Sequence, residues 1–308
     1  SGSAAIHATF SLFSLGDQFV VGSDVYGGTF RLINKVLKRF GLEFTVVDMQ
    51  DLEAVENAIQ DNTVAVYFET PTNPLLQIAD IKAIADIAKK HGIKTIVDNT
   101  FATPYNQQPL TLGADIVVHS ATKYLGGHSD VVAGLAVTND DEIAEQLAFL
   151  QNSIGSTLGP DDSWLLQRGM KTLGARMRAH QENANEVINF LQNDDHIGKI
   201  YYPGLKDFPG HEIAAKQMRN FGAMISFELK DGLDAKKFVE SLQLIDLAES
   251  LGGIESLIEV PAVMTHGSIP REIRLENGIK DELIRLSVGI EDPEDIIADL
   301  KQALDQLD

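Results

Sequence analysis

The chain has 308 residues, 44% of them hydrophobic, which is enough to bury a sizeable core in one large and one smaller domain. Its formal net charge of −20 would repel phosphate backbones and anionic lipids, and no apolar run is long enough for a membrane span, so neither nucleic acid nor a membrane is expected as a partner. The absence of cysteine excludes disulfides, thiolate metal sites and cysteine nucleophiles, and it is compatible with the cytoplasmic location that we expect.

The first predicted element is a helix over residues 1–15. Gly2 and Ser3 lie at its start, where backbone N–H groups could bind a phosphate or could belong to an ordinary helix cap. The sequence D-V-Y-G-G-T at 24–29 predicts a turn from a strand into the next helix. Beside its two glycines, the ring of Tyr26 could lie flat against a planar cofactor and its phenol could exchange a proton with substrate, whereas a packed tyrosine is the plainer alternative.

Two further strands are predicted at 44–47 and 64–68, with a helix at 52–60 between them. The second strand leads into E-T-P-T-N-P at 69–74, where two prolines fix the loop. Asn73, held in this loop, could hydrogen-bond a phenolic oxygen of a cofactor. An Asn-Pro turn without any ligand is the alternative.

An amphipathic helix at 78–91 precedes a strand-like run that begins at Ile93 and ends in the acid Asp98. Strands that alternate with helices at this spacing predict a mostly parallel sheet with helices on both faces. A carboxylate at the end of such a strand could keep a pyridine nitrogen protonated, which makes the ring an electron sink. Taken alone, Asp98 would more often be a turn or helix cap.

The segment S-A-T-K-Y-L-G-G at 120–127 follows a short apolar strand, so Lys123 lies just past a strand end, where ligands bind in open α/β sheets. A lysine desolvated there becomes a nucleophile, and the hydroxyls of Ser120 and Thr122 suit a phosphate. A solvated surface lysine is the alternative. Together with Asp98 at the same edge, however, Lys123 indicates a Schiff base to pyridoxal phosphate.

The second half of the chain begins with Gly159-Pro160, which predicts the start of one long helix to about Leu191 that joins two domains. Arg285 lies on an alternating strand and needs a partner, either an amino-acid carboxylate or an internal salt bridge. His119 and His128 have no partner at a metal spacing, so no metal site is predicted. A compact α/β substrate domain is indicated by strands at 199–202, 223–229 and 283–288 and helices at 235–242 and 293–307.

Four motifs, D-V-Y-G-G-T at 24–29, E-T-P-T-N-P at 69–74, V-D-N-T-F at 97–101 and S-A-T-K-Y-L-G-G-H-S-D-V at 120–131, resemble the pyridoxal-phosphate enzymes of transsulfuration. This is the cystathionine γ-lyase, γ-synthase and β-lyase group. The resemblance implies the fold-type-I α/β architecture of pyridoxal-phosphate-dependent transferases, with a mostly parallel large domain at 1–175 and a smaller α/β C-terminal domain at 176–308 that begins with a connecting helix. It also implies a homotetramer built as a dimer of dimers, and an N-terminal arm that this chain lacks.

The resemblance also implies roles for individual residues. Lys123 would carry the cofactor and move protons, and Tyr26 would stack on the pyridine ring. Arg285 would bind the substrate's α-carboxylate with help from Ser250, while Glu249 resembles a glutamate that faces the distal end of the substrate in γ-lyases and γ-synthases. Read without the resemblance, the segment around Glu249 is a loop with a cap. The full set implied to bind cofactor or substrate is Gly2, Ser3, Tyr26, Asn73, Asp98, Thr100, Ser120, Thr122, Lys123, Glu249, Ser250 and Arg285.

The predicted activity is therefore that of a pyridoxal-phosphate-dependent carbon–sulfur lyase. It would cleave L-cystathionine by γ-elimination to cysteine, 2-oxobutanoate and ammonia. Two related alternatives are a cystathionine γ-synthase, which adds cysteine to an activated homoserine, and a cystathionine β-lyase, which releases homocysteine. Two alternatives from other classes are a cofactor-free Schiff-base aldolase and a catalytically silent assembly subunit.

Overall fold

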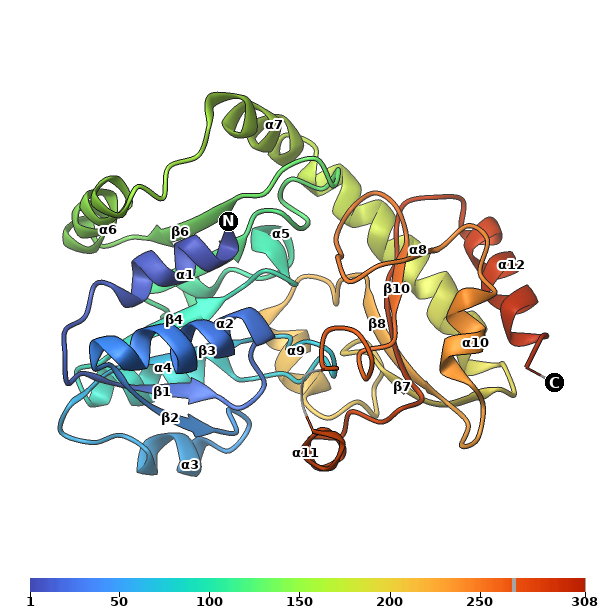
Figure 1. Cartoon of the computed structure of the whole chain (residues 1–308), viewed down its shortest axis with the longest axis horizontal. Helices are drawn as coiled ribbons and strands as arrows, with labels where there is room; N and C mark the ends of the chain where they lie inside the picture. The colour runs from blue at the N-terminus through green and yellow to red at the C-terminus, as the bar shows by residue number, and fades with distance from the viewer. Residues whose placement is uncertain (268–269, 308) are drawn as a thin grey trace.

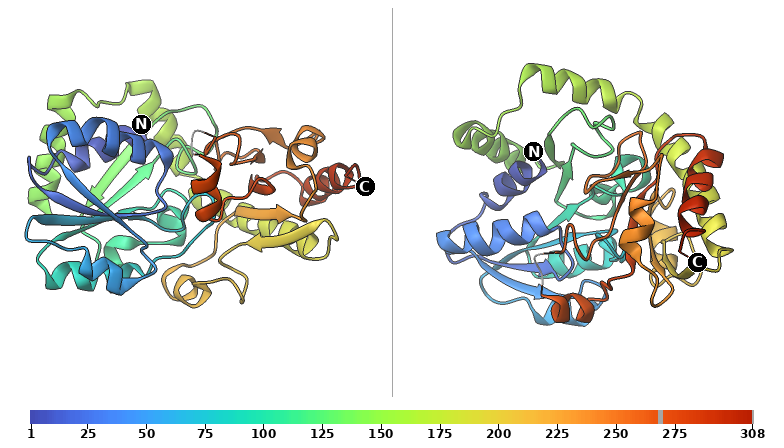
Figure 2. Two further views of the ribbon diagram at one scale, coloured as in Figure 1. Left: turned by 60° about the horizontal axis from the view of Figure 1, so that its bottom comes forward. Right: turned by 45° about the vertical axis from the view of Figure 1, so that its right-hand side comes forward.

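The computed structural model describes residues 1–267 and 270–307. Figure 1 shows the N-terminal elements packed around one sheet and the C-terminal elements around a second, with α8 (Leu173–Gln192) leading from one to the other. Two further views, in Figure 2, show these parts lying side by side. The predicted boundary between residues 175 and 176 lies in the first turn of α8 and stays a prediction. In the described residues, no helix combines the length and apolar character needed to cross a membrane.

The larger sheet has six strands, and its first five strands in space run parallel. The last strand pairs antiparallel with its neighbour, which leaves the sheet mostly parallel and confirms the predicted fold class. The third, fourth and fifth strands in space lead at their carboxyl ends into the polar residues singled out from the sequence. In spatial order the strands are β2 (Glu43–Val47), β1 (Gln18–Gly22), β3 (Thr63–Glu69), β4 (Lys94–Asp98), β5 (Ile116–Ser120) and β6 (Gly134–Thr138).

Helices cover both faces of this sheet, as the alternating pattern predicts. On one face lie α1 (Gly2–Phe10), α2 (Gly27–Arg31) and α6 (Asp141–Ile154), and on the other α3 (Leu52–Asn57) and α4 (Ile81–Lys90). After α2 the chain continues through a π-helical turn and a 3₁₀ turn, and α5 (Thr103–Asn106) follows β4.

Five predicted helices are shorter in the structure, and two of them show a side-chain cause. The first ends at Phe10 and not near residue 15, because Ser11 bonds back to the carbonyl of His7 and the chain then turns. The helix predicted to start at residue 78 starts after Asp80, whose carboxylate accepts the N–H of Ala83 at 2.9 Å. In both cases a side-chain bond at the helix end sets the boundary, which hydrophobic spacing alone does not report.

The single long helix predicted from Gly159-Pro160 is wrong, because the structure has two helices, α7 (Pro160–Met170) and α8. The break follows Gly169, whose carbonyl accepts both the N–H and the hydroxyl of Thr172. Gly169 also presses against the loop after Lys123, since a Cβ there would lie 2.2 Å from the carbonyl oxygen of Gly126. The chain bends at this point and packs on the loop.

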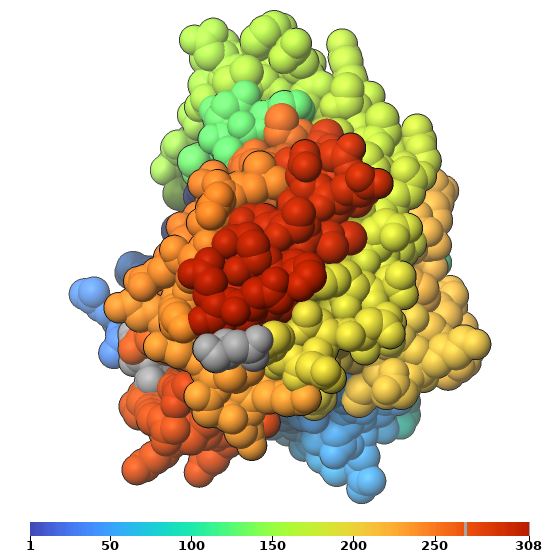
Figure 3. Space-filling view, turned by 90° about the vertical axis from the view of Figure 1, so that its right-hand side faces the viewer, coloured from blue at the N-terminus to red at the C-terminus, as the bar shows by residue number. Residues whose placement is uncertain are grey.

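The smaller sheet has five strands, with three antiparallel pairs and one parallel pair. Its core is closed by α8, α10 (Ala235–Glu240) and α12 (Pro293–Leu304), and Figure 3 shows α12 lying across the outer face of this part of the molecule. Two further helices are α9 (His211–Gln217) and α11 (Arg271–Glu276). In spatial order the strands are β7 (Ile197–Tyr201), β8 (Met224–Leu229), β11 (Leu283–Ser287), β10 (Leu257–Glu259) and β9 (Asp246–Leu247).

Candidate active site

One pocket of about 370 Å³ lies at the carboxyl ends of β3, β4 and β5, between the two sheets. All the residues that the sequence proposed for cofactor and substrate line it, from Gly2 at the start of α1 to Arg285 in β11. The structure therefore brings the whole proposed set together. It also adds residues that the sequence did not indicate, chiefly Glu69 and Thr265.

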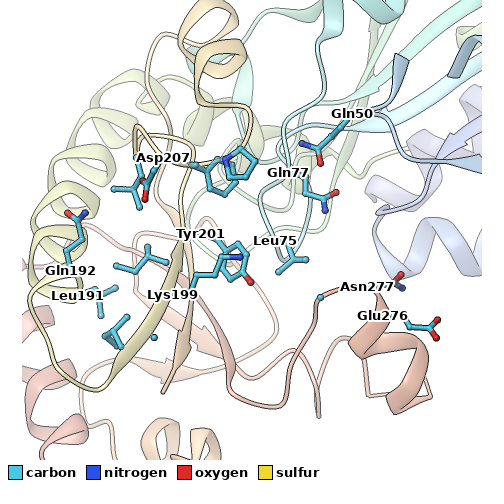
Figure 4. Close-up of a pocket in the computed structure, with 17 residues that line it drawn as sticks. Gln50, Leu75, Gln77, Leu191, Gln192, Lys199, Tyr201, Asp207, Glu276 and Asn277 are labelled. Carbon is cyan, nitrogen blue, oxygen red and sulfur yellow. The ribbon is translucent and has the colours of Figure 1, made fainter. Parts of the chain in front are cut away.

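A larger cavity of about 670 Å³ lies elsewhere, in a groove shown in Figure 4. Gln50 and Gln77 approach it from the N-terminal part, and Lys199 and Tyr201 on β7 approach it from the other side. None of the proposed site residues lines it. We take the smaller pocket as the candidate active site because it holds the buried titratable groups.

Lys123 lies in the turn that follows β5, and its Nζ lies 3.1 Å from the hydroxyl oxygen of Ser250. Burial lowers the pKa of Lys123 to about 8, and the nearby charge of Arg285 acts in the same direction, against the smaller opposite effects of Glu259 and Glu249. A lysine with such a pKa supplies a neutral amine at near-neutral pH, as a Schiff base requires.

Asp98 is the last residue of β4 and is 8% exposed. Burial raises the pKa of Asp98, while hydrogen bonds from Thr100 and Tyr67 act against the rise. Among the residues that the structure describes, no cation forms an ion pair with it. A protonated pyridine nitrogen would supply that charge and keep the carboxylate ionised.

Thr100 is placed to orient Asp98. Its backbone N–H donates to the Asp98 carboxylate at 3.0 Å and its hydroxyl donates to the same oxygen. The Thr100 hydroxyl oxygen also accepts the backbone N–H of Ser120 at 2.8 Å. It thus connects the ends of β4 and β5.

The start of α1 faces the turn after β5 at close range. A Cβ on Gly2 would lie 2.7 Å from the Cβ of Ser120, so only glycine permits this approach. The first backbone N–H groups of a helix have no acceptor within it, and they favour an anion. Ser120 and Thr122 add hydroxyls to the same pocket, where the Thr122 hydroxyl also bonds the backbone of Ala133. These groups together fit a phosphate.

Tyr26 immediately precedes α2, and its side chain is 47% exposed at the pocket. Its backbone N–H donates to the carboxyl oxygen of Glu69 at 2.7 Å. Glu69 ends β3 and pairs in register with Asp98 at the end of β4. This glutamate therefore ties the tyrosine turn to the sheet.

Arg285 is 2% exposed in the middle of β11. One of its terminal nitrogens donates to the side-chain oxygen of Asn73 at 3.0 Å, and it also forms an ion pair with Glu259 at 2.9 Å. The other donates to the backbone oxygens of Glu249 and Ser250. The internal salt bridge considered from the sequence is thus present. Arg285 still lines the pocket.

These residues fit pyridoxal phosphate. The pocket holds a lysine with a lowered pKa, a buried carboxylate without a cation, an aromatic ring and a phosphate cradle, and these are the groups that the cofactor needs. A protein-family model described as "Cys/Met metabolism PLP-dependent enzyme" matches residues 1–305. The chain belongs to this family. The predicted resemblance and cofactor are thereby confirmed.

Relatives within the Cys/Met metabolism family carry different reaction names. The chain is 61% identical over 306 residues to "Cystathionine beta-lyase" of Lactococcus lactis subsp. cremoris MG1363, covering 99% of this chain and 80% of the relative. It is 59% identical over 307 residues to "Cystathionine gamma-lyase" of Bacillus subtilis 168, covering 100% and 81%. A crystal structure of cystathionine gamma-lyase from Lactobacillus plantarum complexed with L-serine matches with a TM-score of 0.98 and 61% identity, over 100% of this chain and 81% of that one.

The sequence reasoning missed two acidic residues of the Cys/Met-family site. Glu69 opens the E-T-P-T-N-P segment at a strand end, a position that already indicated the active edge for Asp98. Glu259 lies on β10, a strand of three residues that is too short to show a periodic pattern. Only the register with β11 reveals it as the partner of Arg285.

Proposed function

We propose that this chain is a carbon–sulfur lyase that cleaves L-cystathionine by γ-elimination and, with hydrolysis by one water, gives cysteine, 2-oxobutanoate and ammonia. The observation that carries the proposal is the position of Glu249 in the same pocket as Lys123, near enough to act on the pKa of that lysine. Cystathionine carries an ammonium group at its distal end, and a carboxylate in the pocket attracts it. The preference for γ-elimination comes from the resemblance of Glu249 to the glutamate of γ-lyases and γ-synthases.

Different residues of the pocket would perform different parts of the reaction. Pyridoxal phosphate, when bound, supplies the electron sink for charge that develops at the substrate's α-carbon. Asp98 holds a proton on the pyridine nitrogen, and Lys123 Nζ, oriented by the Ser250 hydroxyl, moves protons between the α- and β-carbons. Arg285 and Asn73 bind the α-carboxylate. Tyr26 would cover the cofactor ring and, with Lys123, would protonate the departing sulfur.

The test is incubation of the protein and pyridoxal phosphate with L-cystathionine, with products identified by mass spectrometry. We expect cysteine and 2-oxobutanoate in equal amounts. Lys123→Ala should form neither product, which also tests the alternative of a silent assembly subunit. An absence of both products with the wild-type protein would refute the γ-lyase proposal.

The second candidate is β-elimination, which would give homocysteine and pyruvate from the same substrate. It is favoured by the "Cystathionine beta-lyase" name of the Lactococcus lactis relative at 61% identity. The same experiment separates the two reactions by their products. An activated homoserine supplied with cysteine would reveal the third reaction, γ-replacement to cystathionine.

We also propose that the protein assembles as a homotetramer, a dimer of dimers, around these pockets. Large apolar side chains stand exposed beside the pocket, with Tyr26 47% and Val132 64% exposed. A partner subunit would cover them. Light scattering coupled to size exclusion should give a mass of four chains.

A further inference from the structure

Most of the hydrogen-bonding capacity of Arg285 is used inside the protein. A guanidinium has five N–H donors, and four of them point at Asn73, Glu259 and the backbone oxygens of Glu249 and Ser250. Its Nε is buried and has no hydrogen-bond partner among the residues that the structure describes. The plane of the guanidinium is therefore fixed before any ligand arrives.

Among these partners, only Glu259 contacts the guanidinium through a charged side chain. It is 0% exposed, lies directly opposite Arg285 in the antiparallel register of β10 and β11, and its Oε1 is 2.9 Å from Nη1. Burial raises the pKa of Glu259, and the charge of Arg285 pulls it down. Without this carboxylate, Arg285 would be a buried cation with neutral partners, which is an unfavourable state.

The contacts of Glu259 continue to the wall of the pocket. Its Oε1 accepts the hydroxyl of Thr265 at 3.0 Å, and Thr265 lines the same pocket as Lys123. The Thr265 hydroxyl also lies 3.0 Å from Nδ1 of His266. Glu259 itself does not line the pocket, so it acts on a ligand only through Arg285 and Thr265.

We propose that Glu259 is a positioning residue of the substrate site: it holds the Arg285 guanidinium in the orientation that recognises the α-carboxylate of an amino acid. The inference rests on the proposed function only in taking Arg285 as the carboxylate-binding group. The inference adds Glu259 as the residue that sets the geometry of the Arg285 guanidinium. The α-carboxylate of the substrate would then be recognised by residues of β10 as well as β11.

The test compares two small amines on the pyridoxal-phosphate-loaded protein. Glycine carries the carboxylate and has no β-carbon, so it cannot undergo elimination, and methylamine lacks the carboxylate. Their dissociation constants follow from the visible absorption of the bound cofactor. We expect Glu259→Ala to weaken glycine binding by about tenfold or more and to leave methylamine binding unchanged, because only glycine uses Arg285.

Glu259→Gln keeps the side-chain length and an oxygen acceptor, so it should retain more of the glycine affinity than Glu259→Ala does. Glu259→Gln also serves as the test variant if the alanine variant does not fold. The matched control is Glu228→Ala, which removes another buried, ion-paired glutamate from the same sheet, 5% exposed and bonded to Lys280 outside the pocket. That variant should change neither dissociation constant.

Equal weakening of both amines by the Glu259 variants would overturn the proposal, as would unchanged glycine binding in both. The assay does not depend on the reaction. A protein inactive on cystathionine that shows the expected glycine loss would refute only the lyase proposal. A protein that is active on cystathionine, and whose glycine affinity is unchanged in the Glu259 variants, would refute only this inference.

Discussion

At the scale of single residues, the candidate site depends on ionisable groups whose pKa values are shifted by burial. Lys123 is pushed towards its neutral amine, while Asp98 and Glu69 are pushed towards their neutral acids. The two acids end neighbouring strands and face each other in register, so the ionisation of one disfavours that of the other. The cofactor's pyridine nitrogen would give Asp98 a cation, whereas burial and the charge of Asp98 both favour the neutral form of Glu69.

The lowered pKa of Lys123 predicts how the stability of the cofactor-free protein changes with pH. Below about pH 8 the folded state must hold a desolvated ammonium, so Lys123→Met should raise the melting temperature at pH 7. Between the folded pKa near 8 and the unfolded value of 10.5, the unfolded wild-type chain binds more protons than the folded one. The advantage of the methionine variant should therefore shrink as the pH rises through this range, as measured by thermal unfolding. A constant difference across the range would contradict the pKa assignment.

Glu69 provides a second test at this scale. Burial and the charge of Asp98 raise the pKa of Glu69 well above its usual range and so favour its neutral form. Glu69→Gln should keep an uncharged side chain and the acceptor for the N–H of Tyr26. We expect cofactor affinity within about threefold of wild type. Glu69→Leu leaves that N–H without its partner and should weaken cofactor binding by about tenfold. Titration with pyridoxal phosphate, followed by absorption, measures both. Strong loss in the glutamine variant would show that Glu69 is charged.

At the scale of elements, the bend between α7 and α8 is built around one close contact with the loop that follows Lys123. Arg176 on α8 completes it by donating to the carbonyl oxygens of Tyr124 and Gly169 at 2.8 and 2.9 Å. The loop that carries the lysine is thus held from outside the pocket, by a helix break that hydrophobic spacing does not reveal.

Gly169→Ala should disturb this contact. Its Cβ would lie 2.2 Å from the Gly126 carbonyl oxygen, which is backbone and cannot rotate away. We expect a loss of about 1–3 kcal/mol in unfolding free energy and weaker cofactor binding. Gly159→Ala is the control, since the nearest atom to its Cβ would be 3.7 Å away. Urea unfolding of the two variants makes the comparison, and equal stabilities would show that the loop adjusts.

The elements also show why the sequence predicted some features and not others. The strands that end in Asp98 and before Lys123 are buried runs in a parallel sheet, and such runs are visible without any structure. The end of the first helix at Phe10 and the break after Gly169 depend on single hydrogen bonds and one tertiary contact. The Glu259–Arg285 pair depends on strand register, which hydrophobic pattern leaves open.

At the scale of the whole molecule, the pocket takes residues from both sheets, and direct bonds join the two parts next to it. Ser226 on β8 is 0% exposed, and its hydroxyl donates to the carbonyl oxygen of Pro74, beside Asn73. Nδ1 of His180 on α8 lies 2.7 Å from the carbonyl oxygen of Val288, and this contact joins α8 to the end of β11. The loop that carries Asn73 therefore rests on the smaller sheet.

Ser226→Ala should loosen that support. It leaves the buried Pro74 carbonyl without its donor, at a cost of about 1–3 kcal/mol, and we expect weaker glycine binding than in wild type. Ser241→Ala, which removes a bond of similar length within an exposed helix end, should change neither quantity. Thermal unfolding and the glycine titration provide both readouts. Unchanged glycine binding in Ser226→Ala would show that the loop does not need the bond.

The pocket's residues are also ordered along the chain. Every group proposed to hold the cofactor lies between Gly2 and Lys123, whereas Arg285 and its carboxylate partner lie beyond residue 250. During synthesis on the ribosome, the cradle for the cofactor therefore emerges more than a hundred residues before the clamp for the amino acid. The residues proposed to hold the cofactor are therefore made before Arg285 and Glu259, the pair proposed to recognise the amino acid's carboxylate.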